Sequence, residues 1–277
     1  MFFVNDPKLR KIHKATVRDR VLYQAVYRIL YQVFDPTFIF HSYSSRDRKG
    51  THAGIASFEK YIRQVSKNHK SSGYVVKCDI RKFFDSIDHN ILLGLIEQKI
   101  KDANLLMLIR KIIDSFSTGA GKGLPLGNVT SQLFANMYMN QLDQYVKREL
   151  RAKCYIRYCD DFVIVSESND YLQWCLEKME KFCRAELLLD LHPRKVIFRK
   201  IHQGVDFLGY VILPHRRVIR THTKRRLLRK LEKLKLLNDF GAIDVKFIEQ
   251  SVQSYLGVLS HCKGDRIKNQ IERIFYD

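Results

Sequence analysis

The sequence has no apolar run long enough to span a bilayer, and no signal-peptide pattern opens it. Its six cysteines include no Cys-x-x-Cys pair, and its histidines do not complete a zinc-binding set. Internal repeats and low-complexity tracts are also absent. These absences argue against a membrane-spanning protein, a zinc module and a repeat array. We therefore expect a cytoplasmic protein whose cysteines are reduced thiols.

Acidic residues are scarce compared with basic ones. The chain has 29 Asp and Glu against 49 Lys and Arg, which gives a formal net charge of +20. A stable fold does not need such an excess, which carries a cost in self-repulsion. A polyanionic partner is the simplest reason for it, and binding to a nucleic acid should then depend strongly on salt. With 277 residues, 45% of them hydrophobic, the chain can bury a core as one large or two small domains.

Periodicity and turn residues predict a mixture of helices and short strands. Strands are expected on both sides of a turn at residues 5–7, and at 74–79, 155–165, 187–198 and 205–213. Helices are expected over residues 17–33, 52–65, 91–113, 128–150 and 171–185, followed by a helical module from residue 221 onward.

Two adjacent aspartates, Asp160 and Asp161, lie between short runs of apolar, β-branched and aromatic residues. This pattern predicts a β-hairpin with the acids at its turn. Carboxylates gathered at a hairpin tip repel each other and favour a bound cation. Two divalent metals about 3.5–4 Å apart, held by such carboxylates, are how polymerases stabilise the attacking and leaving oxygens. Taken alone, the pair also fits a solvated turn, because Asp is a common turn residue.

Two further segments supply partners for this hairpin. Asp79 ends the apolar strand 74–79 and an aromatic residue, Phe84, follows five positions later, so three acids can converge on one sheet edge. An N-cap role for Asp79 is the alternative. Residues 119–127 contain four of the thirteen glycines and lead into a helix N-terminus, which suits an anionic ligand. An ordinary loop with a helix cap is the alternative there.

Together these segments resemble the palm of a reverse transcriptase: an Asp at a strand end with an aromatic at +5, a Leu-Pro-x-Gly-x-x-x-Ser loop and helix, and Tyr-x-Asp-Asp. The resemblance covers nearly the whole chain. Its finger motifs match residues 18–21 and 42–53, and its later motifs match 192–195, 207–210 and 254–261.

The resemblance implies an α+β right-hand fold with an antiparallel palm sheet backed by helices. Fingers are expected at residues 1–73 and a helical thumb at 223–277. The palm is expected at 74–222, with finger-side helices at about 91–118.

The activity implied by the resemblance is RNA-directed DNA polymerisation with two Mg²⁺ ions, or Mn²⁺, as cofactors. The catalytic, metal-binding residues are expected to be Asp79, Asp160 and Asp161, and the Ile80 carbonyl would complete the metal site. The residues expected to contact the nucleotide are Lys8, Arg10, Arg81, Phe84, Leu126, Gly127 and Lys195. Those expected to contact the nucleic acid are Arg194, Phe207, Leu208, Gly209, Tyr210, Lys224, Arg225 and Arg226.

The positively charged candidates also have plainer interpretations. Lys8 and Arg10 match finger positions that clasp the triphosphate, and a solvated basic hairpin is the alternative. Lys195 matches a candidate acid for pyrophosphate, and the alternative is a phosphate contact or a plain surface charge. Residues 194–235 hold fourteen Lys and Arg against two acids, which favours a template–primer cradle over a solvated helix face.

Phe84 fits the steric gate that excludes a 2′-hydroxyl, because a bulky ring occupies the space that the hydroxyl needs. A core position is the alternative for Phe84, and Phe83 is the expected core member of the pair. A gate at Phe84 favours dNTPs and argues against an RNA-dependent RNA polymerase, whose palm is similar.

Leu126 and Ser131-Gln132 narrow the resemblance, because most reverse transcriptases have Gln and Ser-Pro at these places. The pattern here is similar to reverse transcriptases of diversity-generating retroelements, which copy a template RNA into cDNA with frequent errors opposite adenine. Leu cannot hydrogen-bond near the sugar and base as Gln could, so loose base selection is expected.

The partners implied are template RNA, cDNA or primer, dNTPs and a small basic helical accessory protein, with no membrane. The alternatives are a group II intron-like or phage-defence reverse transcriptase, or an RNA-binding scaffold of the maturase type. Family members usually carry an additional N-terminal segment, whereas this sequence begins almost at the first finger motif.

Overall fold

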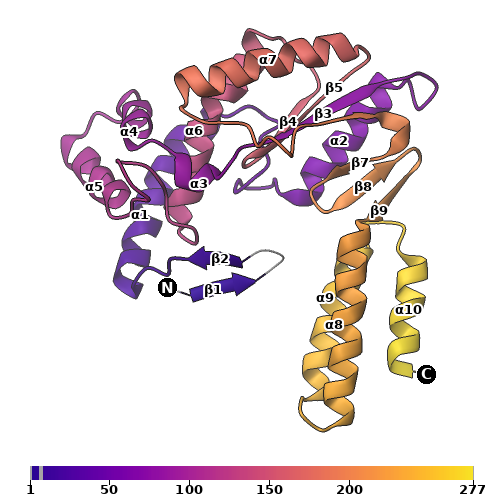
Figure 1. The fold of residues 1–277 in the computed structure, drawn as a ribbon. Coiled ribbons are helices and arrows are strands. Elements are labelled where there is room, and N and C mark those ends of the chain that lie inside the picture. The colour runs from indigo at the N-terminus through magenta and orange to yellow at the C-terminus, as the bar shows by residue number, and fades with distance from the viewer. Residues whose placement is uncertain (1, 6–8, 277) are drawn as a thin grey trace. The chain divides into compact units, whose positions relative to one another are not determined.

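The computed structural model describes residues 2–5 and 9–276, which form two compact units. Unit 1 comprises residues 1–61 and 74–198, and unit 2 comprises residues 62–73 and 199–277. Figure 1 shows a mixture of helices and antiparallel strands, which confirms the predicted α+β class. The residue boundaries expected for fingers, palm and thumb stay a prediction. In the part of the chain that is described, no helix has the length and apolar character needed to cross a membrane.

The sheet of unit 1 is built on β3 (Tyr74–Asp79), β4 (Tyr155–Tyr158) and β5 (Asp161–Ser166). Its order is β4-β5-β3-β6, and the chain passes from unit 1 to unit 2 within β6 (Ile197–Lys200). β5 pairs antiparallel with both β3 and β4. The interior of β5 is apolar on both faces because both faces are buried.

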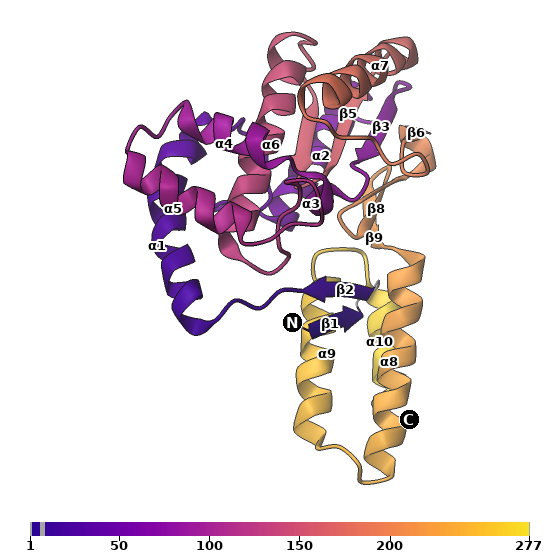
Figure 2. The ribbon, with the colours of Figure 1, turned by 60° about the vertical axis from the view of Figure 1, so that its left-hand side comes forward.

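Helices cover this sheet and form the rest of the core of unit 1. α7 (Asn169–Glu186) lies along β3 and β5 (Figure 1). The largely buried α6 (Val129–Arg148) packs against α1 (Val17–Phe34) and α4 (His89–Glu97). Figure 2 shows α1, α4 and α5 (Ala103–Asp114) grouped beside α6. The buried side chains of these helices and of the sheet form one continuous apolar cluster.

The chain that precedes this core also follows the predicted pattern. β1 (Phe2–Asn5) and β2 (Leu9–Ile12) form the expected antiparallel pair. Lys8 lies outside the described residues, and of Arg10 only the backbone, within β2, is described. Between α1 and β3 the chain forms a short 3₁₀ turn (Asp35–Thr37) and α2 (Thr51–Val65), and between β3 and α4 it forms α3 (Phe83–Ser86).

Two sequence predictions in unit 1 are wrong. The single helix expected over 91–113 is two helices, because the Asp102 side chain accepts a hydrogen bond from the Leu105 amide (2.7 Å) and starts α5 as an N-cap. The strand expected over 187–198 is formed only at its end, by β6. The preceding residues bond to the end of β3 instead, through the amide of Arg81 and the carbonyl of Asp190 (2.9 Å).

Unit 2 contains a small sheet and a helical module. The strand expected over 205–213 is a hairpin of β7 (Val205–Phe207) and β8 (Tyr210–Leu213), and β9 (Arg216–Ile219) was not predicted. The module consists of α8 (Thr221–Asp239), α9 (Val245–Leu259) and α10 (Asp265–Tyr276), seen in Figure 2. The helical module expected from residue 221 onward is confirmed, and its three helices share a buried apolar cluster: Leu227, Leu231, Leu234, Ile248, Leu259, Ile267 and Ile271.

Candidate active site

Three carboxylates meet at one end of the sheet of unit 1. Tyr158 pairs with Asp161, so Cys159 and Asp160 form the two-residue turn of the β4–β5 hairpin. Asp161 in turn pairs with Asp79 at the end of β3. Residues paired in this way have side chains on the same face of a sheet. The structure thus brings the three predicted aspartates together at one sheet end.

The electrostatics of this cluster reflect crowded negative charge. Burial, followed by the charges of Asp79 and Asp161, raises the pKa of Asp160 to about 6. Two lysines partly neutralise the charges of Asp79 and Asp161, the neighbours of Asp160. Lys195 Nζ lies 2.6 Å from Asp79 Oδ2, and Lys77 Nζ lies 3.6 Å from Asp161 Oδ1. Since three carboxylates face two ammonium groups, negative charge remains to attract a cation.

The carboxylate oxygens of this cluster are the donors that hard divalent cations such as Mg²⁺ and Mn²⁺ prefer. Within residues 2–5 and 9–276, however, no three His, Cys, Asp or Glu side chains form a ready-made metal cage. The ion pair with Lys195 engages one oxygen, Oδ2, of the Asp79 carboxylate. The donor chemistry of the three carboxylates fits such ions.

The segment that carries Lys195 is fixed against the end of β3. The His192 amide donates to the Asp79 carbonyl (2.7 Å), and the Lys195 amide donates to the His192 carbonyl (2.9 Å). Ile80 is buried and forms an isolated bridge with Leu191. These bonds explain why the segment does not form the predicted strand and how Lys195 reaches Asp79.

The loop with Leu126 is held from two sides. The Leu126 carbonyl accepts from the His13 amide (2.9 Å), and the Leu124 amide donates to the Phe84 carbonyl (2.7 Å). Gly127 is required here, because its φ is 110° and a Cβ would approach Ile12 Cγ2 to 2.8 Å. Leu126 is half-buried and Gly127 exposed, so both are accessible to a ligand.

Buried His89 also supports this loop, and it was not singled out from the sequence. Its Nε2 lies 2.7 Å from the Gly123 carbonyl, and its amide donates to the Gly121 carbonyl (3.0 Å). Because His89 is the first residue of α4, the N-terminus of this helix anchors the glycine-rich segment that precedes Leu126.

Phe83 and Phe84 divide between core and surface. Phe83 is 3% exposed within the apolar cluster, so its prediction as the core member is confirmed. Phe84 is half-buried, and its ring makes an edge contact with that of Phe83 (centroids 5.4 Å apart). Arg81 is exposed. Phe84 and Arg81 thus remain accessible near the end of β3.

A buried polar group behind the hairpin turn was missed by sequence reasoning. Arg157, on β4, is fully buried, and its guanidinium forms a bidentate ion pair with Asp143 of α6 (Nη2–Oδ2 2.7 Å, Nε–Oδ1 2.8 Å). Its Nη1 donates to the Cys159 carbonyl (3.0 Å), at the turn itself. The signal available in the sequence was a single arginine inside an otherwise apolar and aromatic strand. We call the following residues the Arg157 cluster: Ser42, Asn136, Asp143, Tyr155 and Arg157.

The nucleic-acid candidates of unit 2 differ in exposure. The Phe207 and Tyr210 side chains are buried, and Tyr210 donates its hydroxyl to the Val258 carbonyl (3.0 Å). Leu208 and Gly209, which form the β7–β8 turn, are half-exposed. The turn residues Leu208 and Gly209 are therefore accessible to a nucleic acid, whereas the rings of Phe207 and Tyr210 are not.

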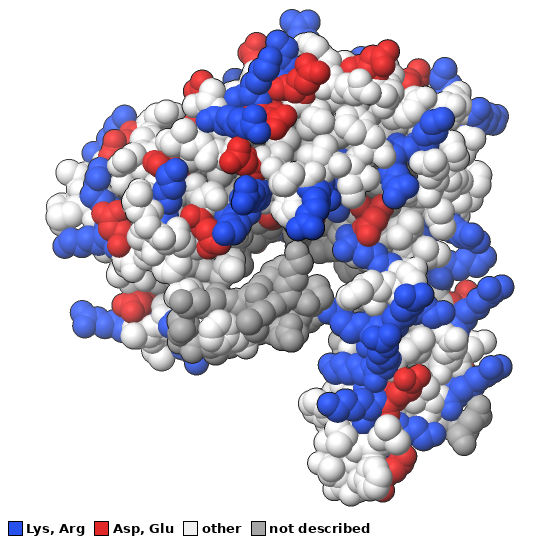
Figure 3. Space-filling view, in the orientation of Figure 1, with Lys and Arg blue, Asp and Glu red and all other residues white. Residues whose placement is uncertain are grey.

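Basic side chains gather on α8 of the same unit. Figure 3 shows Lys and Arg covering the visible face of this helix. Arg225 and Arg226 are exposed and Lys224 is half-buried. Arg194, which belongs to unit 1, is also exposed. This distribution suits a long-range attraction for a polyanion.

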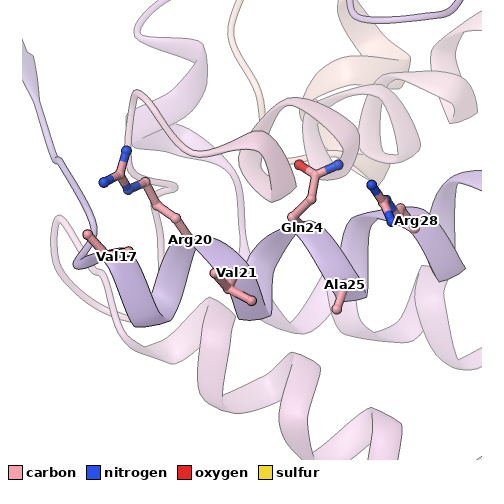
Figure 4. Close-up of a pocket in the computed structure, with 6 residues that line it drawn as sticks. All are labelled: Val17, Arg20, Val21, Gln24, Ala25 and Arg28. Carbon is pink, nitrogen blue, oxygen red and sulfur yellow. The ribbon is translucent and has the colours of Figure 1, made fainter.

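A separate open hollow lies on α1. Figure 4 shows its lining residues, all from this helix: Val17, Arg20, Val21, Gln24, Ala25 and Arg28. Val17 and Val21 are 69% and 68% exposed, on the side of the helix that faces away from the core. None of the carboxylate candidates lines this hollow.

Comparison with known families and proteins gives a consistent result. Residues 5–212 match the family model described as reverse transcriptase (RNA-dependent DNA polymerase). The group II intron-encoded protein LtrA of Lactococcus lactis subsp. cremoris is 26% identical over 76% of this chain and 46% of its own length. The protein YkfC of Escherichia coli is 24% identical, over 76% and 64% respectively. The nuclear intron maturase 3 of Arabidopsis thaliana is 22% identical, over 86% and 37%. The chain thus spans about half the length of the first of these relatives.

Solved structures with a similar fold include two telomerases. Telomerase from Candida tropicalis gives a TM-score of 0.56 at 13% identity, over 94% of this chain and 54% of that one. Telomerase from Candida albicans, solved with a fragment of telomeric RNA, gives 0.55 at 11% identity, over 93% and 48%. At such low identity the likeness concerns the fold alone, and it agrees with a right-hand polymerase fold.

Proposed function

The chain belongs to the reverse transcriptase family, and from this premise we propose that it is an RNA-directed DNA polymerase acting by metal-assisted nucleotidyl transfer. One observation carries the proposal. Asp79 and Asp161 pair directly across two strands, and Asp160 stands beside them in the hairpin turn. Burial, together with the charges of both neighbours, raises the pKa of Asp160 to about 6. Such a cluster has the chemistry to hold divalent cations at a site of phosphoryl transfer.

The roles follow from the accessible groups. Asp79, Asp160 and Asp161 would hold the divalent ions, Mg²⁺ or Mn²⁺, together with the carbonyl of Ile80. When bound, such ions lower the pKa of the primer 3′-hydroxyl and stabilise charge on the triphosphate. Lys195, released from Asp79, would be free to neutralise or protonate the leaving pyrophosphate.

The remaining nucleotide contacts are assigned to three places: the hairpin of β1 and β2, the segment that follows β3, and the loop with Leu126. We assign triphosphate contacts to Lys8, Arg10 and Arg81, since guanidinium and ammonium groups suit phosphate oxygens. Phe84 would exclude the 2′-hydroxyl of a ribonucleotide. The half-buried Leu126 and the exposed Gly127 would line the space near the base and sugar.

Primer extension on a defined RNA template tests this function. We expect DNA from dNTPs in the presence of Mg²⁺ and little product from rNTPs. Phe84→Ala should admit ribonucleotides, and Phe83→Leu, which changes the core neighbour, is the matched control that should not. Tight RNA binding with no synthesis under any divalent ion would contradict the proposal and favour an RNA-binding scaffold.

We further propose that the polymerase serves a diversity-generating retroelement, with a template RNA, a cDNA and a small basic helical accessory protein as partners. The support is Leu126, which offers no hydrogen bond to the sugar or base. Errors concentrated opposite adenine are expected in the product. Leu126→Gln should lower the error frequency, whereas Leu126→Met, which keeps an apolar side chain of similar size, should not.

The alternative is a polymerase of the group II intron type, which the intron-encoded relatives favour. Accurate DNA from the same assay, with equal error spectra for wild type and Leu126→Gln, would select this alternative. The two candidates share the carboxylate site, and this assay distinguishes them by base selection.

A further inference from the structure

Arg157 is a fully charged side chain with no access to solvent, yet every donor it has is used. A guanidinium carries five N–H groups. Nε donates to both Asp143 oxygens (2.8 and 2.9 Å), Nη2 to Asp143 and to Ser42 Oγ (2.7 and 2.9 Å), and Nη1 to Asn136 Oδ1 and the Cys159 carbonyl (both 3.0 Å). Side-chain exposure is 0% for both Arg157 and Asp143.

Stability alone is a poor reason for such a group. Removing two charges from water is costly, and an apolar pair of similar volume often stabilises a core equally well. Among the bonds that an apolar side chain could not make, the one to the Cys159 carbonyl reaches the hairpin turn. That carbonyl belongs to the turn residue directly before Asp160. Cys159 has a φ of 57°, a conformation that non-glycine residues seldom adopt without support.

The same guanidinium ties the turn to α6. Asn136 and Asp143 are two turns apart on one face of that helix, so together they hold Arg157 in one place. α6 begins at Val129, directly after the loop that carries Leu126 and Gly127. Arg157 therefore fixes the position of the hairpin turn relative to α6, the helix that follows the loop with Leu126.

A second attachment fixes the strand itself. The Arg157 amide donates to the His41 carbonyl (3.0 Å), and the Arg157 carbonyl accepts from the Tyr43 amide (2.9 Å). Ser42, between these two residues, also accepts from the guanidinium. The backbone and the side chain of Arg157 are thus held by the same short segment, which leaves the turn little freedom to shift.

We propose that Arg157 is a positioning residue that sets the place of Asp160 by holding the Cys159 carbonyl, a role that rests on the proposed polymerase function. It contacts neither substrate nor metal and acts only through the turn. Loosening the turn should displace one carboxylate of the cluster relative to the other two. A displacement of about 1 Å in a reacting group can lower a rate roughly a hundredfold.

The test compares three variants with the wild-type protein. Arg157→Met/Asp143→Asn removes both buried charges, keeps a partner for the Tyr155 hydroxyl and deletes the donor to the turn. Arg157→Lys keeps a cation against Asp143, but an ammonium lacks the planar fork needed to serve Asp143 and the turn together. Tyr155→Phe is the matched control, because it deletes one bond of the same cluster (Tyr155 hydroxyl to Asp143, 2.8 Å) and leaves the turn contact intact.

The measurements are cooperative thermal unfolding, RNA binding, kcat and KM for dNTPs, and binding of Mn²⁺ alone by paramagnetic resonance. We expect the double variant to fold and bind RNA, with kcat reduced about a hundredfold, KM changed only a few-fold and weaker Mn²⁺ binding. Arg157→Lys should show the same pattern. If the double variant does not fold, the comparison is made between Arg157→Lys and wild type. Tyr155→Phe should lose stability while keeping kcat and Mn²⁺ affinity.

Folded Arg157 variants with kcat and Mn²⁺ affinity equal to those of Tyr155→Phe would overturn the positioning role. A wild-type protein that makes no DNA would instead refute the proposed function. In that case the Mn²⁺ comparison still decides whether Arg157 positions the carboxylates, so the two failures are distinguishable.

Discussion

The two hairpin turns at residues 159–160 and 208–209 meet the same backbone requirement in different ways. Each turn has two residues, and each needs positive φ, at Cys159 (57°) in unit 1 and at Leu208 and Gly209 (47° and 95°) in unit 2. Strand twist favours such turns, and glycine or asparagine usually supplies them. Gly209 follows this rule, whereas Leu208 beside it does not. Cys159 does not follow it either, and its carbonyl is held by buried Arg157.

The turn at 208–209 depends on local sequence, whereas the turn at 159–160 depends on tertiary contacts. A glycine allows the conformation wherever the chain places it, but it fixes nothing beyond itself. A turn held from behind by a buried guanidinium has a defined position relative to the core, which a site with several carboxylates requires. Substitutions at the two turns and beside them test this difference.

Asp160→Ala should abolish DNA synthesis, because the turn would lose the carboxylate that completes the cluster. The expected loss in rate is at least about a thousandfold, or roughly 4 kcal/mol of transition-state stabilisation. Primer extension measures it, with RNA binding as the check that the fold survives. The control at the other hairpin is Asp206→Ala, which removes an exposed ion pair with Arg220 and should change the rate only a few-fold. A rate within tenfold of wild type for Asp160→Ala would contradict the assignment.

The pKa of Asp160 predicts a pH dependence of stability in the metal-free protein. Its pKa in the folded protein, about 6, lies above the ordinary value of 3.8, so the folded state binds more protons than the unfolded state between these values. The free energy of unfolding should therefore fall as pH rises through this window, by up to about 3 kcal/mol. Below about pH 4 both states are protonated and the contribution is constant.

Urea denaturation of wild type and Asp160→Asn between pH 4 and 7 isolates this contribution as the difference between two profiles. The Asn variant should lack the decline, because its side chain does not titrate. Parallel profiles for the two proteins would show that folding does not raise the pKa of Asp160.

Gly209→Ala should destabilise unit 2 by about 1 kcal/mol, because the φ of 95° is unfavourable for an L side chain. The effect is conformational and not steric, since a Cβ at this position meets no atom within 4 Å. Gly257→Ala is the matched control in the same unit. Gly257 lies inside α9 with equally open surroundings, so alanine there should stabilise by about 0.5–1 kcal/mol. Chemical denaturation measures the free energy of unfolding of both variants. A loss of stability in both would contradict a conformational cause at Gly209.

Cys159→Ala should have the smallest effect. Burial and the nearby charge of Asp160 raise the pKa of this thiol, so it is not a reactive thiolate at neutral pH. Alanine keeps a Cβ and can adopt the same φ under the hold of Arg157, with less than about 1 kcal/mol of packing lost. Thermal unfolding and primer extension should both remain close to wild type. A rate loss above tenfold would mean that the sulfur itself contributes to the site.

The sequence could predict what depends on neighbours in the chain. The strand 74–79 and the hairpin after Tyr155 are short apolar runs bounded by turn residues, so local pattern identifies them. The converging aspartates follow from those strands. The break between α4 and α5 was within reach, since Asp102 is a good N-cap, but apolar periodicity on both sides concealed it.

The remaining features depend on contacts between distant residues. The segment before β6 is apolar enough to be a strand, yet its backbone bonds go to Asp79 and Arg81. The Arg157 cluster joins residues 115 positions apart, so no window of sequence reveals it. A lone arginine in an apolar strand indicates that a buried partner exists, but not which of 29 acids it is.

The interrupted order of unit 2 has a consequence for how the protein is made. Its first segment, residues 62–73, leaves the ribosome before the 125 residues of 74–198 and well before residues 199–277. At about 5–20 residues per second, that interval lasts roughly 6–25 s. During this time the Gly73 carbonyl cannot receive its partner, the amide of Ile201 (2.9 Å). Unit 1 is therefore fully synthesised before the second segment of unit 2, and a chaperone that acts during translation would meet Gly73 before its partner Ile201 exists.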